Sequence, residues 1–254
     1  MSVRSYLDGA VFAERRAGTG TGPATTLLAM HGWGRDRSDM VRFVGDRDAL
    51  IPDMPGFGAS PAPPEAWGAA DYARAVAEML EADGAAPYVV VGHSFGGRVG
   101  AALAAERTDL VAGVVFLGVP LVPLAPNGRP ALTYRAARAL HRWKILPEAS
   151  MERMRQRYGS ADYKAAQGVM RGVLVRVVAE DYSPYLRRID APVAFCWGLR
   201  DTTVPPEVAT RAAAITPHVV DVDIVDGAGH DVMFDAPERA RAAIDKVVAA
   251  AGHA

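Results

Sequence analysis

Short apolar runs alternate with stretches of helical periodicity over most of the chain, which opens as two strands around a turn at Asp8–Gly9. Runs of strand length occupy Val3–Leu7, Val11–Arg16, Thr25–Met30, Ala49–Pro52, Tyr88–Val91, Val111–Leu117, Val193–Trp197 and Val219–Val225. Helical patterns occupy Asp71–Glu81, Ser94–Glu106, Pro206–Ala214 and Pro237–Ala250, with Asp71 as a candidate cap. Because strands and helices alternate, we predict an α/β fold whose mostly parallel sheet is covered on both faces.

The alternation stops between residues 121 and 190. This region holds no convincing buried strand, and its helical patterns, at Leu132–Trp143, Ser150–Tyr158 and Ala161–Ala179, are separated by Pro and Gly. We therefore expect a helical insertion at 121–190 in a core made of residues 1–120 and 191–254.

Length and composition narrow the class of protein. The chain has 254 residues, enough for one large domain, and a net charge of −1 gives no electrostatic footprint for nucleic acid. The single cysteine, Cys196, excludes an intrachain disulfide and predicts a buried, inert thiol. Residues 1–14 lack a signal-peptide core, and no run of about 20 apolar residues exists, so we expect a cytoplasmic protein without a membrane span.

The strongest candidate chemistry lies at Gly92–Gly96, which reads Gly-His-Ser-Phe-Gly. An apolar strand precedes this motif and an Ala-rich helix follows it, as a sharp turn that exposes the oxygen of Ser94 requires. Gly92 and Gly96 give the turn room, and the helix dipole points at a developing oxyanion. The structural alternative is a Gly-rich turn with Ser94 as a cap.

This segment resembles the nucleophile elbow of the α/β-hydrolase superfamily. The resemblance covers about residues 25–120 and 190–248, and it implies an eight-stranded, mostly parallel sheet with a helical cap inserted after the sixth strand. The His-Gly-Trp-Gly at 31–34 looks like the family's oxyanion motif. By resemblance, the backbone N–H groups of Trp33 and Phe95 hold the oxyanion, Gly32 keeps the backbone accessible, and His31 braces loops.

The family's chain order, serine then acid then histidine, selects the other two catalytic residues. Among the six histidines, His230 follows the last strand in a Gly-rich loop, where the family's base lies. Asp201 follows the seventh strand and is the expected acid; Asp226, only four residues before His230, is the competitor. Residues 118–120, the alternative acid position, contain no carboxylate. We therefore predict Ser94, Asp201 and His230 as a catalytic triad.

In this family the cap sets substrate choice. Residues 121–190 carry 13 Lys or Arg against 6 Asp or Glu, and the rest of the chain carries 15 against 23. A basic cap favours an anionic substrate, for example an acyl group on coenzyme A or on a carrier protein, although solvated helix faces give the same count. The 31–34 motif is also similar to esterases of pimeloyl-carrier-protein methyl esters. The resemblance implies no cofactor, and no metal-ligand cluster is visible.

The expected reaction is hydrolysis of a carboxylic ester or thioester with a small to medium apolar acyl group. Haloalkane dehalogenases and epoxide hydrolases of this fold use an aspartate where this chain has Ser94. C–C bond hydrolysis, lactone opening, perhydrolysis and hydroxynitrile cleavage use the same triad and stay open. A slow binding protein or receptor of the same fold is a further alternative.

Overall fold

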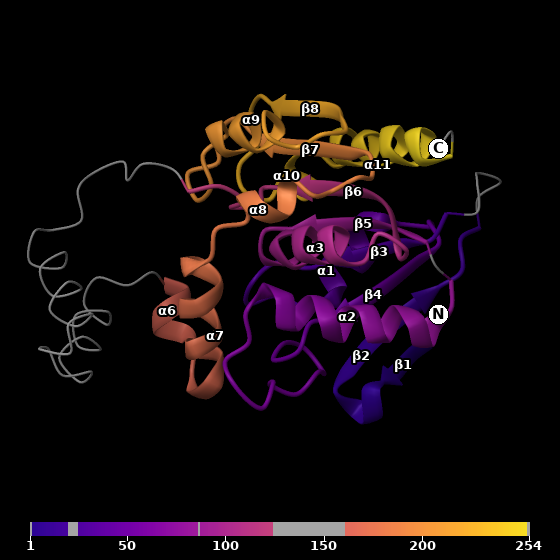
Figure 1. Cartoon of the computed structure of the whole chain (residues 1–254), viewed down its shortest axis with the longest axis vertical. Helices are drawn as coiled ribbons and strands as arrows, with labels where there is room; N and C mark the ends of the chain where they lie inside the picture. The colour runs from indigo at the N-terminus through magenta and orange to yellow at the C-terminus, as the bar shows by residue number, and fades with distance from the viewer. Residues whose placement is uncertain (1, 20–24, 86, 124–160, 253–254) are drawn as a thin grey trace, which may run out of the picture.

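The computed structural model describes residues 2–19, 25–85, 87–123 and 161–252. Within these residues one eight-stranded sheet has the order β1-β2-β4-β3-β5-β6-β7-β8 (Figure 1). Its strands are β1 (Ser2–Tyr6), β2 (Val11–Arg16), β3 (Leu27–Met30), β4 (Ala49–Asp53), β5 (Tyr88–His93), β6 (Val111–Leu117), β7 (Val193–Gly198) and β8 (Val219–Val225). β2 pairs antiparallel with β1 and β4, and all other neighbours are parallel.

Helices cover both faces of the sheet. One face packs against α2 (Ala69–Asp83), α3 (Phe95–Glu106), α8 (Ser183–Leu186) and α9 (Glu207–Ala213). The other packs against α1 (Arg37–Val44), α10 (Val232–Asp235) and α11 (Pro237–Ala251). A short 3₁₀ turn, η1 (Leu7–Gly9), joins β1 to β2. The result is a three-layer α/β architecture (Figure 1).

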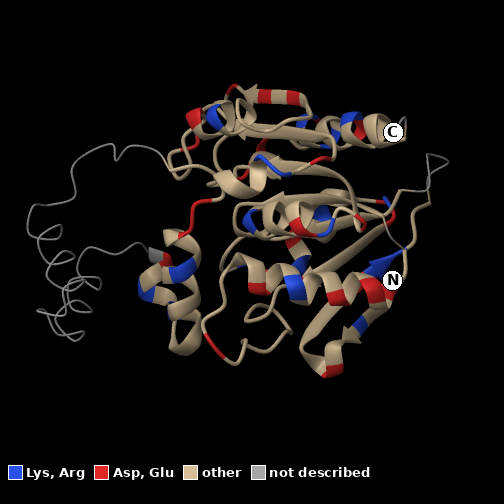
Figure 2. Cartoon of the chain, viewed as in Figure 1, with Lys and Arg blue, Asp and Glu red and all other residues tan. Residues whose placement is uncertain are grey.

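The burial of each strand follows from its place in the sheet. Every residue of β5 is buried, because helices cover this central strand on both sides, and its sequence is therefore a continuous apolar run. The edge strand β8 instead carries Asp221 and Asp223, and red bands mark acidic residues on this strand in Figure 2. The two aspartates pair with Lys246 at 2.8 Å and Arg239 at 2.6 Å on α11. Charges on an edge strand discourage pairing with another chain.

The predicted fold class is confirmed, with corrections in several elements. The helix expected over Ala161–Ala179 is two helices, α6 (Ala161–Ala165) and α7 (Gly168–Ala179), because the chain turns at Gly168 with a φ of +51°. Asp71 is not the cap of α2; that residue is Gly68, and the Asp71 carboxylate accepts its N–H at 2.9 Å. α1 and α10 were not predicted. The patterns at 132–143 and 150–158 lie outside the described residues.

Residues 161–190, the described part of the expected insertion, contact the core at two places. Tyr163 of α6, Leu174 of α7 and Ala166 between the two helices form a small apolar cluster, against which Trp33 packs just beyond β3. Further on, Tyr182 and Leu186 are buried in the same apolar cluster as the sheet and α3. No helix in the described part of the chain has both the length and the apolar character that crossing a membrane requires.

Candidate active site

Ser94 lies in a sharp turn between β5 and α3. Its backbone has φ 48° and ψ −108°, a strained conformation for a residue with a side chain. Glycines around it permit the turn: a Cβ at Gly92 would lie 2.4 Å from the Cα of Gly97, and one at Gly96 would lie 2.4 Å from the carbonyl oxygen of Met30. The serine is half-buried at the carboxyl end of the central strand. Backbone strain of this kind holds a side chain in a fixed direction.

The candidate oxyanion loop, residues 31–34, follows β3 and lies beside this turn. The N–H of Gly96 donates to the carbonyl of His31 at 3.1 Å, which ties the loop to the start of α3. Among the described residues, the backbone N–H groups of Trp33 and Phe95 have no hydrogen-bond acceptor. The Trp33 and Phe95 rings meet edge to face, with centroids 5.4 Å apart. Two N–H donors are thus available beside Ser94.

His31 is fully buried and bridges two loops. Its Nδ1–H donates to the carbonyl of Gly32 at 2.8 Å, and its Nε2 accepts the N–H of Met54 at 3.0 Å. Burial lowers the pKa of His31, so the ring is neutral, as the acceptor role of Nε2 requires. Asp53, in the preceding strand, accepts from the backbone N–H of Arg37 and of Ala59 at 2.8 Å each. These contacts hold the oxyanion loop on the 53–60 turn.

Asp201 and His230 come from two loops that follow adjacent strands, β7 and β8. His230 Nδ1–H donates to Asp201 Oδ2 at 2.8 Å. The Asp201 side chain is buried, and its Oδ1 also accepts the N–H groups of Thr203 and Val204, at 2.9 and 2.8 Å. With its proton on Nδ1, a neutral His230 keeps a lone pair on Nε2. The competitor, Asp226, is exposed, and the hydrogen bond from His230 Nδ1 goes to Asp201 instead.

His93 is a part of the site that the sequence did not single out. It immediately precedes Ser94, is 1% exposed, and its Nε2–H donates to the carbonyl of His230 at 3.1 Å. The two imidazole rings have centroids 5.1 Å apart. A Cβ at Gly32 would lie 2.8 Å from His93 Nδ1, so the oxyanion loop touches the same ring. No local pattern reveals this role, because both partners are distant in sequence.

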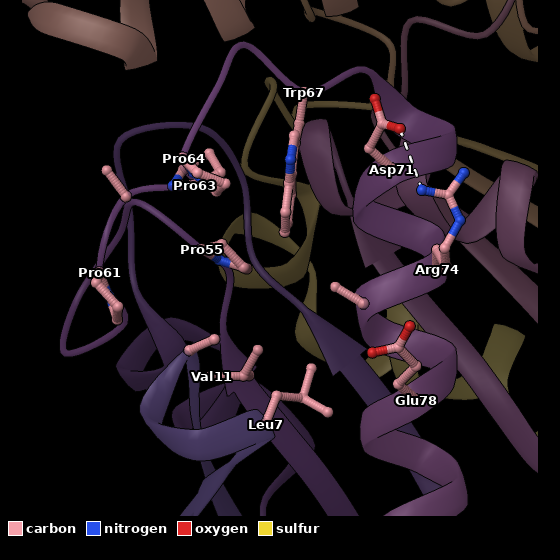
Figure 3. A pocket seen from close by; sticks show the side chains of 13 residues that line it. Leu7, Val11, Pro55, Pro61, Pro63, Pro64, Trp67, Asp71, Arg74 and Glu78 are labelled. Atoms are coloured by element: carbon pink, nitrogen blue, oxygen red, sulfur yellow. Dashed lines mark hydrogen bonds and ion pairs between the residues drawn. The ribbon is translucent and has the colours of Figure 1, made fainter.

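Two other features bear on binding. A cavity of about 320 Å³ lies between the β1–β2 turn, the 55–67 loop and α2. The Trp67 ring projects into it (Figure 3). Asp71 and Arg74, 3.4 Å apart, stand at its rim. None of the residues lining this cavity is Ser94, Asp201 or His230, so it is separate from the cluster described above. The described residues contain no group of three or more side chains suited to hold a metal ion.

A serine at a strained strand-to-helix turn, an Asp–His pair on the loops after two neighbouring parallel strands, and a mostly parallel sheet are the features of an α/β hydrolase. The chain belongs to the alpha/beta hydrolase family, whose model matches residues 27–243. It is therefore a hydrolase whose fold implies a small-molecule substrate.

Named relatives span several activities. The chain is 29% identical to haloalkane dehalogenase 2 of Mycobacterium tuberculosis, a match covering 89% of this chain and 87% of that protein. It is 41% identical to lipase LipV of the same organism over 101 residues, 38% of each chain. The structure of a thermophilic esterase from Thermogutta terrifontis superposes with a TM-score of 0.67 at 24% identity, covering 95% of this chain and 93% of the esterase. This last likeness shows the fold alone.

Proposed function

We propose that the protein hydrolyses a carboxylic ester through an acyl-enzyme on Ser94, with His230 as the base, Asp201 as its orienting acid, and the N–H groups of Trp33 and Phe95 as oxyanion donors. The observation that carries the proposal is the 2.8 Å hydrogen bond from His230 to the buried Asp201. It fixes the imidazole tautomer in which Nε2 can take a proton. Ser94, half-buried in the strained turn that directly follows His93, is the nucleophile this base would serve.

In the proposed reaction, Ser94 Oγ attacks the ester carbonyl carbon while its proton passes to His230 Nε2. The carbonyl oxygen becomes an oxyanion held by the two N–H donors. The imidazolium then gives the proton to the leaving alcohol, whose C–O bond breaks, and an acyl-Ser94 ester is left. Water, deprotonated by His230, attacks this ester, and the acid and free Ser94 are released with the proton returned to Ser94 Oγ.

The similarity to a haloalkane dehalogenase raises halide displacement as the alternative. If Ser94 Oγ displaced a halide from an alkyl carbon, the product would be an alkyl ether. An ether has no carbonyl carbon for water to attack, so the enzyme would stop after one event. Attack on an acyl group instead leaves an ester that the same base and oxyanion donors can hydrolyse. The serine therefore favours acyl substrates.

Residues 121–190 are proposed to form the cap over this site. Of that segment, the described part contributes Tyr163, Ala166 and Leu174, which pack with Trp33 beside the oxyanion loop. Their apolar character favours a small to medium apolar acyl group over a sugar or a peptide.

The first experiment is hydrolysis of p-nitrophenyl esters from C2 to C12, with the Ser94→Ala variant as the blank and halide release from 1-chlorobutane measured in parallel. We expect turnover only with the esters, and only when Ser94 is present. Halide release that survives Ser94→Ala, or no ester turnover above the blank, would reject the proposal and favour one of the other reactions or a receptor of the same fold.

Anionic thioesters are a finer proposal, which rests on the basic excess of residues 121–190. Most of that excess lies outside the described residues: from 161 to 190 there are 5 Lys or Arg against 4 Asp or Glu. If the cap attracts an acyl-CoA, kcat/KM for that thioester falls as salt rises, while kcat/KM for a neutral ester stays constant. A flat response for both substrates would remove the idea.

A further inference from the structure

Two loops that must keep a fixed separation during the proposed reaction are joined by an ion pair outside the triad. The oxyanion loop carries Trp33 and continues to Arg35, and the base loop carries His230 and continues to Asp231. Arg35 Nη2 lies 2.9 and 2.7 Å from the two carboxylate oxygens of Asp231, 196 positions away in the chain. Each partner is two residues or fewer from the group that would act on the substrate.

Beneath this ion pair, His93 contacts both loops from the core. Its Nε2–H donates to the His230 carbonyl at 3.1 Å and lies 3.6 Å from Asp231 Oδ1. On its other side the ring lies against Gly32, where even a Cβ would be 2.8 Å from Nδ1. His93 therefore fills the space between the loops, and the ion pair closes it at the surface.

We propose that Arg35, Asp231 and His93 are positioning residues that hold the oxyanion donors and the base of the active site at one fixed separation. This inference rests on the proposed function, because that proposal names the oxyanion donors and the base. The three positioning residues themselves are assigned no contact with substrate. Displacement of a reacting group by about 1 Å can cost a factor of about 100 in rate. Loss of the ion pair between the loops should consequently lower kcat more than it weakens substrate binding.

The charges around the pair support this assignment. Arg35 also reaches Asp39 of α1 at 2.6 Å, so one guanidinium anchors the base loop to a helix of the core. The Asp231 side chain pairs with Arg35 and makes no capping hydrogen bond to α10. At the start of that helix the Asp231 backbone carbonyl accepts the N–H of Phe234 at 2.7 Å. The carboxylate can therefore be neutralised as an amide without removing the backbone contact.

The test uses Arg35→Met, Asp231→Asn and the double variant, assayed on the best p-nitrophenyl ester. We expect kcat to fall at least tenfold in each single variant, with KM changed less than threefold. The double variant should fall no further, because both changes break the same contact. The matched control is Arg239→Met, which breaks an Arg–Asp pair of 2.8 and 2.6 Å between α11 and β8, away from the site.

Wild-type kcat in the single variants, losses that multiply in the double variant, or an equal loss in Arg239→Met would overturn the proposal. If the wild type has no Ser94-dependent turnover, the proposed function fails separately. The positioning role is then tested on the low-field proton signal of His230 Nδ1–H, assigned by its loss in His230→Ala. The signal should broaden away in Arg35→Met and Asp231→Asn but not in Arg239→Met. Its persistence in all three would reject the positioning role.

Discussion

At the scale of single residues, the candidate site depends on where each hydrogen-bonding group ends up. Asp201 is buried and receives two backbone N–H groups on one oxygen, which leaves the other oxygen directed at His230. Asp226 is nearer in sequence to the histidine but is exposed. Proximity along the chain is therefore a poor guide to which carboxylate forms the hydrogen bond with His230.

Replacing Asp201 with Asn tests this assignment. The amide can present an N–H toward Nδ1, which favours the wrong imidazole tautomer and removes the charge that stabilises the imidazolium. We expect kcat on a p-nitrophenyl ester to fall by a factor of about 10⁴, as in comparable triads, with little change in KM. Asp226→Asn is the matched control and should retain wild-type kcat. Comparable losses in both variants would contradict the assignment.

His93 makes a second residue-scale prediction, about stability and pH. Burial, and then the neighbouring His230, lower the pKa of His93 to about 4, whereas an unfolded histidine has a pKa near 6.5. Between these values only the unfolded chain binds the proton, so folding stability falls as the pH drops from about 6.5 toward 4. From pH 7 to pH 5 the loss from this residue is about 2 kcal/mol.

The measurement is urea unfolding at pH 7 and pH 5. His93→Gln cannot take up a proton, so its free energy of unfolding should fall less than that of the wild type over this interval. An equal decrease in the free energy of unfolding of the wild type and of His93→Gln would mean that protonation of His93 is not a cause of the acid sensitivity.

At the scale of elements, the turn from β5 into α3 is held by close backbone packing. α3 approaches β3 so closely that the Gly96 Cα has no room for a side chain against the Met30 carbonyl. Four residues further along the helix, a Cβ at Gly100 would meet only side-chain atoms, Val90 Cγ1 at 3.0 Å and Met30 Cε at 3.4 Å. Two glycines on one face of the same helix thus tolerate substitution differently.

We expect Gly96→Ala to lower the free energy of unfolding by about 2 kcal/mol and to abolish ester turnover, because α3 must move away from β3 and carry Phe95 with it. Gly100→Ala is the matched control. Its side-chain neighbours can shift and alanine favours the helix, so stability should stay within about 1 kcal/mol of wild type. Chemical denaturation and kcat of both variants check this, and equal effects would contradict the packing argument.

At the scale of the whole molecule, the expected cap segment is joined to the core through Glu180. Its Oε2 accepts the N–H of Ala69 at 3.1 Å, at the start of α2, and the hydroxyl of Tyr182 donates to the same oxygen at 2.9 Å. A side chain at Gly68 would collide with this carboxylate, so the glycine permits the approach. The negative charge also lies at a helix N-terminus, where it is favourable.

Glu180→Ala should therefore lower the free energy of unfolding by about 1 to 2 kcal/mol, because it leaves the N–H of Ala69 without its acceptor and removes the charge from the helix end. Glu78→Ala, an exposed carboxylate on α2 itself, is the control and should change stability by less than about 0.5 kcal/mol. The urea midpoints of unfolding of Glu180→Ala, Glu78→Ala and the wild type measure the two losses of stability. A destabilisation no larger in Glu180→Ala than in the control would mean that this contact does not join the segments.

The sequence by itself determined the succession of the strands with α2, α3, α9 and α11 along the chain, the fold class and the glycines around Ser94. These depend on local apolar runs and on backbone conformations that few residues tolerate. It did not reveal the break at Gly168, the helices α1 and α10, or the role of Gly68 as the cap of α2. In each case the outcome depends on packing against another segment, which periodicity does not record.

Only the tertiary structure decided which charged and polar side chains meet. The pairs Asp201–His230, His93–His230 and Arg35–Asp231 join residues 29, 137 and 196 positions apart. Parallel strands bring their carboxyl ends to one edge of the sheet, so loops far apart in the chain converge there. The sequence specifies the residues of each loop, but their distances arise from the register and twist of the sheet between them.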